Sequence, residues 1–524
     1  MAGAVAPDAL KAMIRDGAEL AIVDAREEGE FGTGHLFWAS PLPRSRLPLF
    51  ARALFPNACA RIVVTDDGRG LAEQAAAELE TMGYGNVAVL AGGTPAWRDA
   101  GYVLFTGVNV PSKAFGEWVE HHYGTPSIDA AELKALIDAG ADMVVLDSRP
   151  LDEFRRMSIP GGINVPGGEL AYRIGALAPN PGTLVVVNCA GRTRSILGAE
   201  SLRSAGVPNR VVALRNGTMG WELAGFACAR GETARYPEGR PPDAEAAFAR
   251  AEALRVKHGV GLVDRATLDA WHRDPGRTLY VFDVRDPSEY AAGHLAFARS
   301  APGGQLVQAT DGWIAVRNAR VVLVDDDGVR ARMTAQWLAQ MGHRDVHVLE
   351  GAEEDFTATG AWVPPGEVPD AETIPLREAH AAWQAGRLRV VDLARSIEFR
   401  EGHIPGALWG VRTRLAALAG RLPESGIVAV TSPDGNRLAR LAVEEVADLT
   451  AARVGVLERG TAGWAAAGLP LEADRTDPPD AACIDVHLRP YDRNSGVEEA
   501  MQAYLAWEID LLREIERDGD AAFG

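Results

Sequence analysis

Cysteine is scarce in this sequence. The chain of 524 residues contains four cysteines, and they are Cys59, Cys189, Cys228 and Cys483. Four are too few for the disulfide framework of a secreted protein. No spacing among them resembles a zinc site. We therefore expect no metal ion and no cofactor, and we expect the thiols to be reduced.

Long apolar runs are missing, and positive charge is in deficit. No run approaches the length that spans a membrane, and residues 1–8 lack the basic start and apolar core of a signal peptide. Lys and Arg number 53 against 72 Asp and Glu, a formal net charge of -19. This balance argues against nucleic acid or an anionic membrane as a partner. We therefore expect a cytoplasmic protein.

A unit of alternating strands and helices recurs four times along the chain. Its first strand ends in Asp and reads AIVDAR, VVLDSR, YVFDVR and VVDLAR. An acidic–aromatic pair follows each copy, and three copies then carry Gly-His, with Ser158 in its place in the second. A second strand, a helix and a third strand complete the unit, and three copies close on Gly-Thr-x-x-Trp. This alternation predicts a mainly parallel sheet with helices on both faces.

The spacing of these copies predicts four domains and a tail. We place the domains at residues 1–107, 124–236, 259–364 and 373–475, and the tail at 476–524. An amphipathic helix is expected near 497–517, and we expect its apolar stripe to pack on the chain's own domains. A homodimer contact through this helix is the alternative. The stripe consists of Met501, Tyr504, Leu505, Leu511, Leu512 and Ile515.

Cys189 directly follows the second strand of the second copy. A turn and a helical pattern come next, so the thiol is expected where a strand ends and a loop enters a helix. Ligands of open α/β sheets bind at that edge. The loop N–H groups, the helix N-terminus, Arg192 and Arg194 all favour an anion there. Such surroundings favour a thiolate over a thiol; a buried structural cysteine is the alternative.

The four copies resemble rhodanese (sulfurtransferase) domains over about residues 10–475. The resemblance is carried by the Asp-x-Arg strand end, Glu-Phe, Gly-His-Ile-Pro-Gly-Ala at 402–407, the cysteine loop and Gly-Thr-x-x-Trp. It implies four tandem α/β domains, each a five-stranded parallel sheet flanked by helices. It also implies transfer of a sulfane sulfur from a donor to a nucleophilic acceptor, through a persulfide on the loop cysteine.

The resemblance and the loop chemistry together assign the site residues. Cys189 is the expected nucleophile, because attack on a sulfur–sulfur bond needs a thiolate. Thiosulfate is the first choice of donor, and small persulfides come next; cyanide or a thiol is the expected acceptor. Arg149, Arg155 and Arg156 are candidates for the rim or support of the pocket. The expected donor-binding residues are Ala190, Gly191, Arg192, Thr193, Arg194 and Ser195.

The other three copies are expected to be catalytically silent. Asp66 aligns with Cys189 in the first copy, Asp325 or Asp326 in the third, and Ser432 in the fourth. A carboxylate cannot carry a persulfide and repels an anionic donor. A hydroxyl without a base is not a comparable nucleophile.

Two other functions remain open. In the first, the protein is a sulfur carrier or scaffold, and Cys189 delivers sulfur to a bound partner. In the second, it is a phosphatase or arsenate reductase of related fold. Those chemistries place Arg six residues after the cysteine, where this chain has Ser195. The shorter loop suits a sulfur atom and crowds a phosphoryl group.

Overall fold

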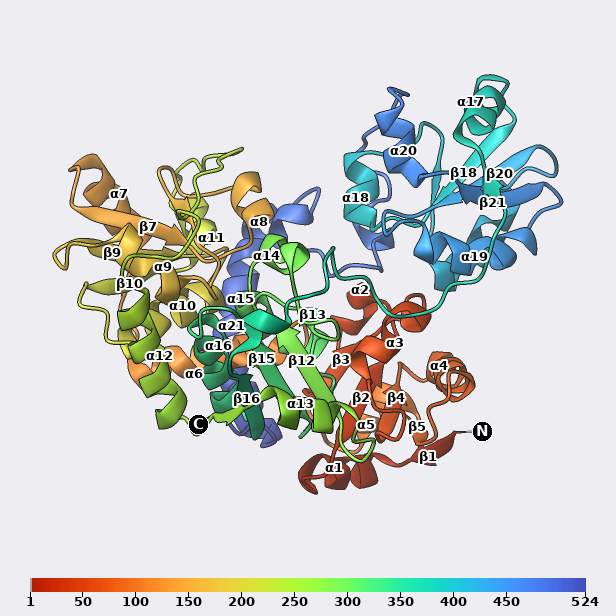
Figure 1. Ribbon diagram of the computed structural model, residues 1–524. Coiled ribbons are helices and arrows are strands. Elements are labelled where there is room, and N and C mark those ends of the chain that lie inside the picture. The colour runs from red at the N-terminus through yellow and green to blue at the C-terminus, as the bar shows by residue number, and fades with distance from the viewer. Residues whose placement is uncertain (1) are drawn as a thin grey trace.

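Four parallel sheets, each flanked by helices, make up the computed structural model (Figure 1). It describes residues 2–524, so Met1 of the expected first domain lies outside the described residues. The predicted fold class, four α/β units with a helical tail, is confirmed. Within the described residues, no helix is long and apolar enough to cross a membrane.

The first sheet has one strand more than expected. Its strand order is β1-β5-β4-β2-β14, and β3 pairs with β2. The additional strand β14 (Val316–Arg317) comes from the third unit and runs antiparallel to β2. The first unit's own strands are β1 (Gly3–Val5), β2 (Leu20–Asp24), β3 (Ala39–Pro41), β4 (Ile62–Thr65) and β5 (Val87–Leu90). Its helices are α1 (Pro7–Arg15), α2 (Glu28–Phe31), α3 (Leu47–Leu54), α4 (Leu71–Thr81) and α5 (Gly93–Asp99).

The second unit contains the cysteine loop. Its sheet is ordered β6-β10-β9-β7-β8, all parallel. The strands are β6 (Ser127–Ile128), β7 (Met143–Asp147), β8 (Ile163–Asn164), β9 (Leu184–Asn188) and β10 (Val211–Leu214). The helices are α7 (Ala130–Asp138), α8 (Leu151–Arg156), α9 (Leu170–Leu177), α10 (Thr193–Ser204) and α11 (Gly217–Leu223).

The third and fourth units repeat the same strand order, as β11-β16-β15-β12-β13 and β17-β21-β20-β18-β19. The third has β11 (Gly261–Val263), β12 (Leu279–Asp283), β13 (Arg299–Ser300), β15 (Arg320–Val324), β16 (Asp345–Leu349), α13 (Arg265–His272), α14 (Pro287–Ala292), α15 (Gly303–Gln308) and α16 (Arg330–Gln340). The fourth has β17 (Thr373–Ile374), β18 (Leu388–Asp392), β19 (Leu408–Trp409), β20 (Ile427–Thr431), β21 (Arg453–Leu457), α17 (Leu376–Gln384), α18 (Ser396–Glu401), α19 (Arg437–Ala447) and α20 (Gly460–Ala466).

The repeated motifs fix the loops at the strand ends. In the first three units the Arg of Asp-x-Arg forms a buried ion pair with its own Asp, as Arg149 does with Asp147 at 2.7 Å. In the first, third and fourth units, the aromatic residue of the acidic–aromatic pair stacks on the histidine four residues later. Phe399 and His403, for example, have ring centroids 3.8 Å apart. These contacts fix the loop after the first long strand of a unit. The loop that holds Cys189 follows the second long strand of its unit.

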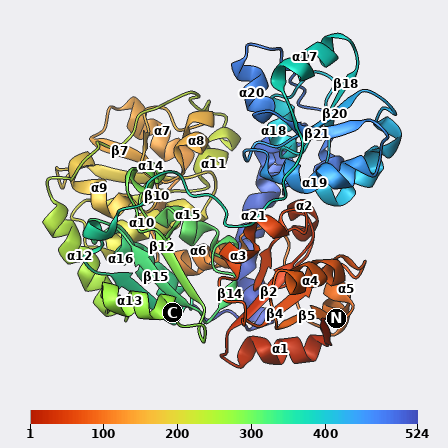
Figure 2. The ribbon, with the colours of Figure 1, turned by 45° about the vertical axis from the view of Figure 1, so that its right-hand side comes forward.

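Three helices lie outside the repeats. Helix α6 (Val110–Tyr123) joins the first two units, and α12 (Ala244–Lys257) joins the second and third. The tail forms α21 (Val497–Asp518), which packs along α6. Figure 2 shows α21 between the red first unit and the yellow and green second and third units. Its stripe is buried or half-buried against the first two units, so the expected packing on the chain itself is found. A homodimer stays a prediction.

Candidate active site

Cys189 is the first residue after β9, and α10 begins four residues later. The thiol is buried, with the residue 2 % exposed. Its Sγ donates to Ser195 Oγ at 3.5 Å, and that hydroxyl donates to the Arg192 carbonyl at 2.8 Å. The loop therefore folds back so that Ser195 contacts the sulfur of Cys189.

The Gly-Thr-x-x-Trp motif of the second unit donates hydrogen bonds to the backbone of the cysteine loop. The N–H groups of Thr218 and Met219 donate to the carbonyls of Cys189 and Ala190 at 2.9 and 3.0 Å. Gly217 has φ +55°, and a Cβ there would lie 2.3 Å from the Cys189 carbonyl oxygen. A side chain at this position would push the loop away, so glycine is required by both backbone conformation and space.

The backbone N–H groups of the cysteine loop are available to a ligand. Within residues 2–524, the N–H groups of Ala190, Gly191 and Arg192 have no protein acceptor. The positive end of α10 lies next to them, with Thr193 as its first residue. Grouped N–H donors at a helix N-terminus favour an anion. The backbone of the predicted donor-binding loop is therefore suited to that role.

The first unit satisfies the matching loop with its own carboxylate. Asp66 follows β4 as Cys189 follows β9. Its Oδ1 accepts from Gly68 N at 2.7 Å, and its Oδ2 accepts from Leu71 N at 2.7 Å and Ala72 N at 3.2 Å. The side chain of this unit thus occupies three N–H groups of the loop and of the start of α4, which a donor anion could otherwise use.

In the third and fourth units the matching side chain accepts from one N–H group near the start of the following helix. The strand register identifies Asp325 as the counterpart of Cys189, because Val324 pairs with Asp283 as Asn188 pairs with Asp147. Asp325 Oδ2 accepts from Ala331 N at 2.9 Å, and burial raises the pKa of this carboxyl well above its usual range. In the fourth unit Ser432 Oγ accepts from Ala439 N at 3.0 Å.

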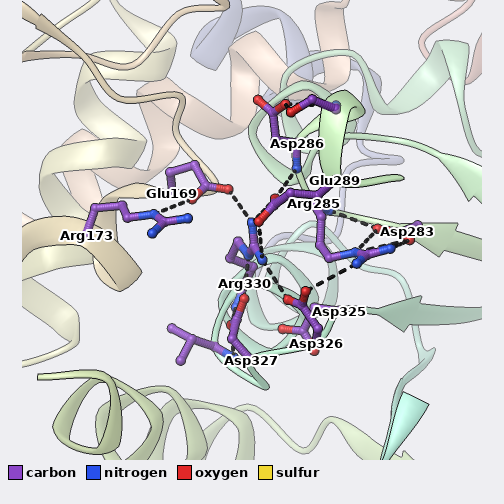
Figure 3. Close-up of polar contacts among 12 residues, drawn as sticks. Glu169, Arg173, Asp283, Arg285, Asp286, Glu289, Asp325, Asp326, Asp327 and Arg330 are labelled. Atoms are coloured by element: carbon purple, nitrogen blue, oxygen red, sulfur yellow. Dashed lines mark hydrogen bonds and ion pairs between the residues drawn. The ribbon is translucent and has the colours of Figure 1, made fainter. Parts of the chain in front are cut away.

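The third unit's loop also carries a buried arginine that binds the second unit. Figure 3 shows Arg330 among Glu169, Glu289, Asp326 and Asp327. Its N–O distance to Glu169, which belongs to the second unit, is 2.8 Å. The silent loop is therefore a structural contact between units.

Arg194 is the cationic side chain best placed for the donor. It donates to both oxygens of Glu153 at 2.9 and 2.8 Å. Burial alone would lower its pKa, but the charges of Glu153 and of Cys189 raise it, so the guanidinium stays charged. Burial likewise opposes ionisation of Glu153, yet Arg194 and Arg489 lower the pKa of Glu153 to about 2. The pair is charged throughout the physiological range.

The side chain of Arg192 does not lie where a donor-binding residue was expected. Its guanidinium turns to α6, where it donates to both oxygens of Glu117 at 2.7 Å and also to Glu120. Among the described residues that line the cavity over the loop, Arg192 is absent. Its role there is to anchor the loop to α6, because its charge is already matched by two carboxylates. No motif marks these partners, which lie outside the repeats.

The three rim candidates fall in different places. Arg149 and Arg156 line the cavity, and Arg156 also pairs with Asp492 of the tail at 3.0 Å. Arg155 points to solvent and is not among the cavity-lining residues of the described chain. Arg149 therefore supports the strand end and faces the cavity at once.

A cavity of about 230 Å³ lies over the cysteine loop. Ala190 and Arg194 of the loop line it, whereas Cys189 is not among the lining residues of the described chain. Other residues of the second unit, Lys113 of α6 with the segment before it, the third unit, Arg475 and the tail supply the rest of the lining. The tail contribution, His487, Arg489, Tyr491, Asp492, Tyr504 and Trp507, was not predicted.

A buried network ties the tail helix to the loop. Lys113 of α6 donates to the Tyr504 hydroxyl and to Glu508 at 3.0 Å, and Tyr504 donates to Glu508 at 2.9 Å. Thr193 Oγ1 donates to the same Glu508 oxygen at 3.2 Å. Tyr504 was recognised only as part of an apolar stripe, and no motif marks Lys113 or Glu508. Within residues 2–524, no group of His, Cys, Asp and Glu is placed to hold a metal ion.

Comparison with known proteins gives a consistent family. The model of the rhodanese-like domain matches residues 6–100, 129–224 and 265–359. A crystal structure of a thiosulfate sulfurtransferase from Pseudomonas aeruginosa is similar over the full length: TM-score 0.93, 47 % identity, 100 % of this chain and 99 % of that chain.

Two curated proteins match parts of the chain. An HTH-type transcriptional regulator from Mycobacterium tuberculosis is 29 % identical over 215 residues, covering 38 % of this chain and 85 % of the relative. YrkF of Bacillus subtilis, named as a sulfur carrier protein, is 26 % identical over 102 residues, covering 20 % of this chain and 54 % of the relative. The chain thus spans about half of YrkF.

Proposed function

Since the chain belongs to the rhodanese-like family, we propose that it is a sulfurtransferase that carries a sulfane sulfur on Cys189. One observation carries the proposal. Of the four residues that follow the matching strands, only Cys189 is a thiol, and among the described residues only its side chain accepts no hydrogen bond from an N–H group of the following loop or helix start. The similarity to the Pseudomonas aeruginosa thiosulfate sulfurtransferase supports this reaction class.

The transfer proceeds in two half-reactions. The Cys189 thiolate attacks the outer sulfur of thiosulfate; the sulfur–sulfur bond of the donor breaks, and sulfite leaves with the bonding electron pair. Cys189 is now a persulfide. An acceptor nucleophile, cyanide or a thiolate, then attacks the outer sulfur and releases the Cys189 thiolate. Division into two displacements gives ping-pong kinetics.

The chain's own groups suit the charges of these steps. Thiosulfate and sulfite are dianions, so the loop N–H groups and Arg194 stabilise both the bound donor and the leaving group. Glu153 fixes the guanidinium of Arg194 through two hydrogen bonds.

Thiocyanate production from thiosulfate and cyanide tests the proposal. We expect Cys189→Ser to lose it, because a serine hydroxyl does not form the persulfide. Cys228→Ser is the matched control: burial and Glu222 raise the pKa of Cys228 to about 12, so this thiol stays protonated and inactive. Wild-type thiocyanate production by Cys189→Ser would overturn the assignment.

A sulfur-carrier role is the second candidate, favoured by the local similarity to YrkF. In that case Cys189 holds a persulfide but discharges it only to a protein partner. Repeated turnover with thiosulfate and cyanide in the purified protein excludes the carrier role. A single loading without turnover supports it.

A further inference from the structure

The cavity over the cysteine loop is strongly cationic, in contrast to the chain as a whole. The chain has a net charge of -19, yet this cavity is lined by seven arginine and lysine side chains and by two carboxylates, Glu153 and Asp492. The cations are Lys113, Arg149, Arg156, Arg194, Arg230, Arg475 and Arg489.

Most of these cations have carboxylate partners. Arg149, Arg156 and Arg194 pair with Asp147, Asp492 and Glu153, and Lys113 pairs with Glu508. Arg489 is 3.8 Å from Glu153, which already holds Arg194 at 2.8 Å.

Arg230 and Arg475 are different. Arg230 donates to the Arg156 carbonyl at 3.2 Å, and Arg475 donates to the Tyr491 carbonyl at 3.5 Å. Within residues 2–524, neither has a carboxylate partner. Both are exposed and line the cavity; Arg230 lies near the end of the second unit, and Arg475 is the last residue of the fourth. Their guanidinium groups can therefore still donate hydrogen bonds to an anionic ligand.

The cavity exceeds what a small inorganic donor requires. One water needs roughly 10–15 Å³ of such space, and this cavity has about 230 Å³. Part of its wall is apolar, formed by Met219, Tyr491, Tyr504 and Trp507. A cationic rim and an apolar wall together suit an organic molecule that carries separated negative charges.

We propose that this cavity binds the sulfur acceptor, and that the acceptor is an organic thiol with two or more carboxylates. The inference rests on the proposed function of Cys189. Arg230 and Arg475 bind the carboxylates, and the apolar wall contacts the carbon skeleton. The acceptor thiolate attacks the outer sulfur of the Cys189 persulfide, forms a new sulfur–sulfur bond, and returns the electron pair of the broken bond to Cys189 as thiolate.

Acceptor kinetics with charged and uncharged compounds test this inference. Thiosulfate is the donor, and the acceptors are cyanide, 2-mercaptoethanol with no carboxylate, cysteine with one, and glutathione with two. For Arg230→Ala with Arg475→Ala, we expect the ratio of kcat/KM for glutathione to that for cyanide to fall about tenfold or more, because charge-assisted hydrogen bonds are lost. The ratio of kcat/KM for 2-mercaptoethanol to that for cyanide is expected to stay constant. The ratio for cysteine to cyanide is expected to fall less than the ratio for glutathione to cyanide.

The control is Arg513→Ala, an exposed arginine of α21 far along the helix from the cavity-lining residues. It should leave every ratio unchanged. A glutathione ratio that does not change in the double variant would overturn the inference, even with cyanide turnover intact. Absence of thiocyanate in the wild type would instead remove the proposed function itself, so the two failures are distinguishable.

Discussion

The identity of one residue per unit separates the active loop from its silent copies. Asp66 accepts hydrogen bonds from Gly68 N and from the start of α4, and Asp325 accepts one from the start of α16, so each side chain takes up N–H groups that a ligand could use. Cys189 leaves those donors to the substrate. A thiol in place of a carboxyl group therefore supplies a nucleophile and also leaves more N–H groups for an anion.

Arg194 should matter more for the donor than any other side chain of the loop. Arg194→Ala removes the charge that lines the cavity beside Cys189. We expect persulfide formation from thiosulfate to slow about tenfold or more, since hydrogen bonds to charged groups contribute about 1.5–3 kcal/mol. Single-turnover loading at several thiosulfate concentrations measures this.

Arg155→Ala is the matched control, because its side chain is exposed and outside the cavity lining. It should load at the wild-type rate. Equal loading rates in Arg194→Ala and Arg155→Ala would contradict the role given to Arg194.

At the scale of elements, the site depends on two helices that belong to no repeat. Helix α6 anchors Arg192 through Glu117 and Glu120, and α21 places Tyr504 and Glu508 against the loop. A Cβ at Gly191 would lie 3.2 Å from Tyr504 Cε1 and 3.3 Å from Glu508 Oε2. The tail helix is therefore in direct contact with the cysteine loop.

Glu508→Gln tests the attachment of the tail. Glu508 is 1 % exposed and pairs with the buried Lys113. Loss of one partner leaves a buried charge without compensation, which costs about 3–5 kcal/mol. We expect a lower midpoint of denaturant unfolding and weaker sulfur transfer together. Glu516→Gln, at an exposed glutamate of the same helix, should change neither the unfolding midpoint nor sulfur transfer. An unchanged midpoint in Glu508→Gln would show that the Glu508–Lys113 pair does not stabilise the tail.

At the scale of the whole molecule, the silent units build the surroundings of the second. The first and third share a sheet through β14, and Arg330 joins the third to the second. The third unit and the tail line the cavity over Cys189. We infer that the silent units are kept for packing and for the shape of this cavity.

A buried carboxyl at a junction of units makes stability depend on pH. Asp311 lies beside β3 of the first unit and α6, and neither of its oxygens has a hydrogen-bond partner among the described residues. Burial raises the pKa of Asp311 to about 7. The folded state therefore holds its proton where the unfolded chain has lost it, and this stabilising term is full below about pH 4 and is lost as pH rises through about 7.

Asp311→Asn removes this titration while keeping the shape of the side chain. We expect the variant to gain thermal stability relative to the wild type as pH rises from 5 to 8, with thermal unfolding at each pH as the measurement. Asp448→Asn, at an exposed position, should follow the wild type. A constant difference between Asp311→Asn and wild type across this range would contradict the account.

The sequence was sufficient for features that repeat or that are local. Four copies of one pattern predict the fold, and the residues around Cys189 predict the loop, because strand ends, turns and helix starts depend on neighbours in sequence. It was not sufficient for Arg192, whose partners are Glu117 and Glu120, or for Tyr504 and Glu508. Those contacts join segments that are distant in sequence and carry no motif, so only packing of the whole chain reveals them.

The central claim is that one residue of the four equivalent positions carries the sulfur. The most direct test is the intact mass of the protein after incubation with thiosulfate and then cyanide, beside Cys189→Ser. The account predicts a gain of one sulfur atom per chain, removed by cyanide, and no gain in Cys189→Ser. A sulfur adduct on Cys189→Ser, or no adduct on the wild type with thiosulfate or glutathione persulfide, would contradict it.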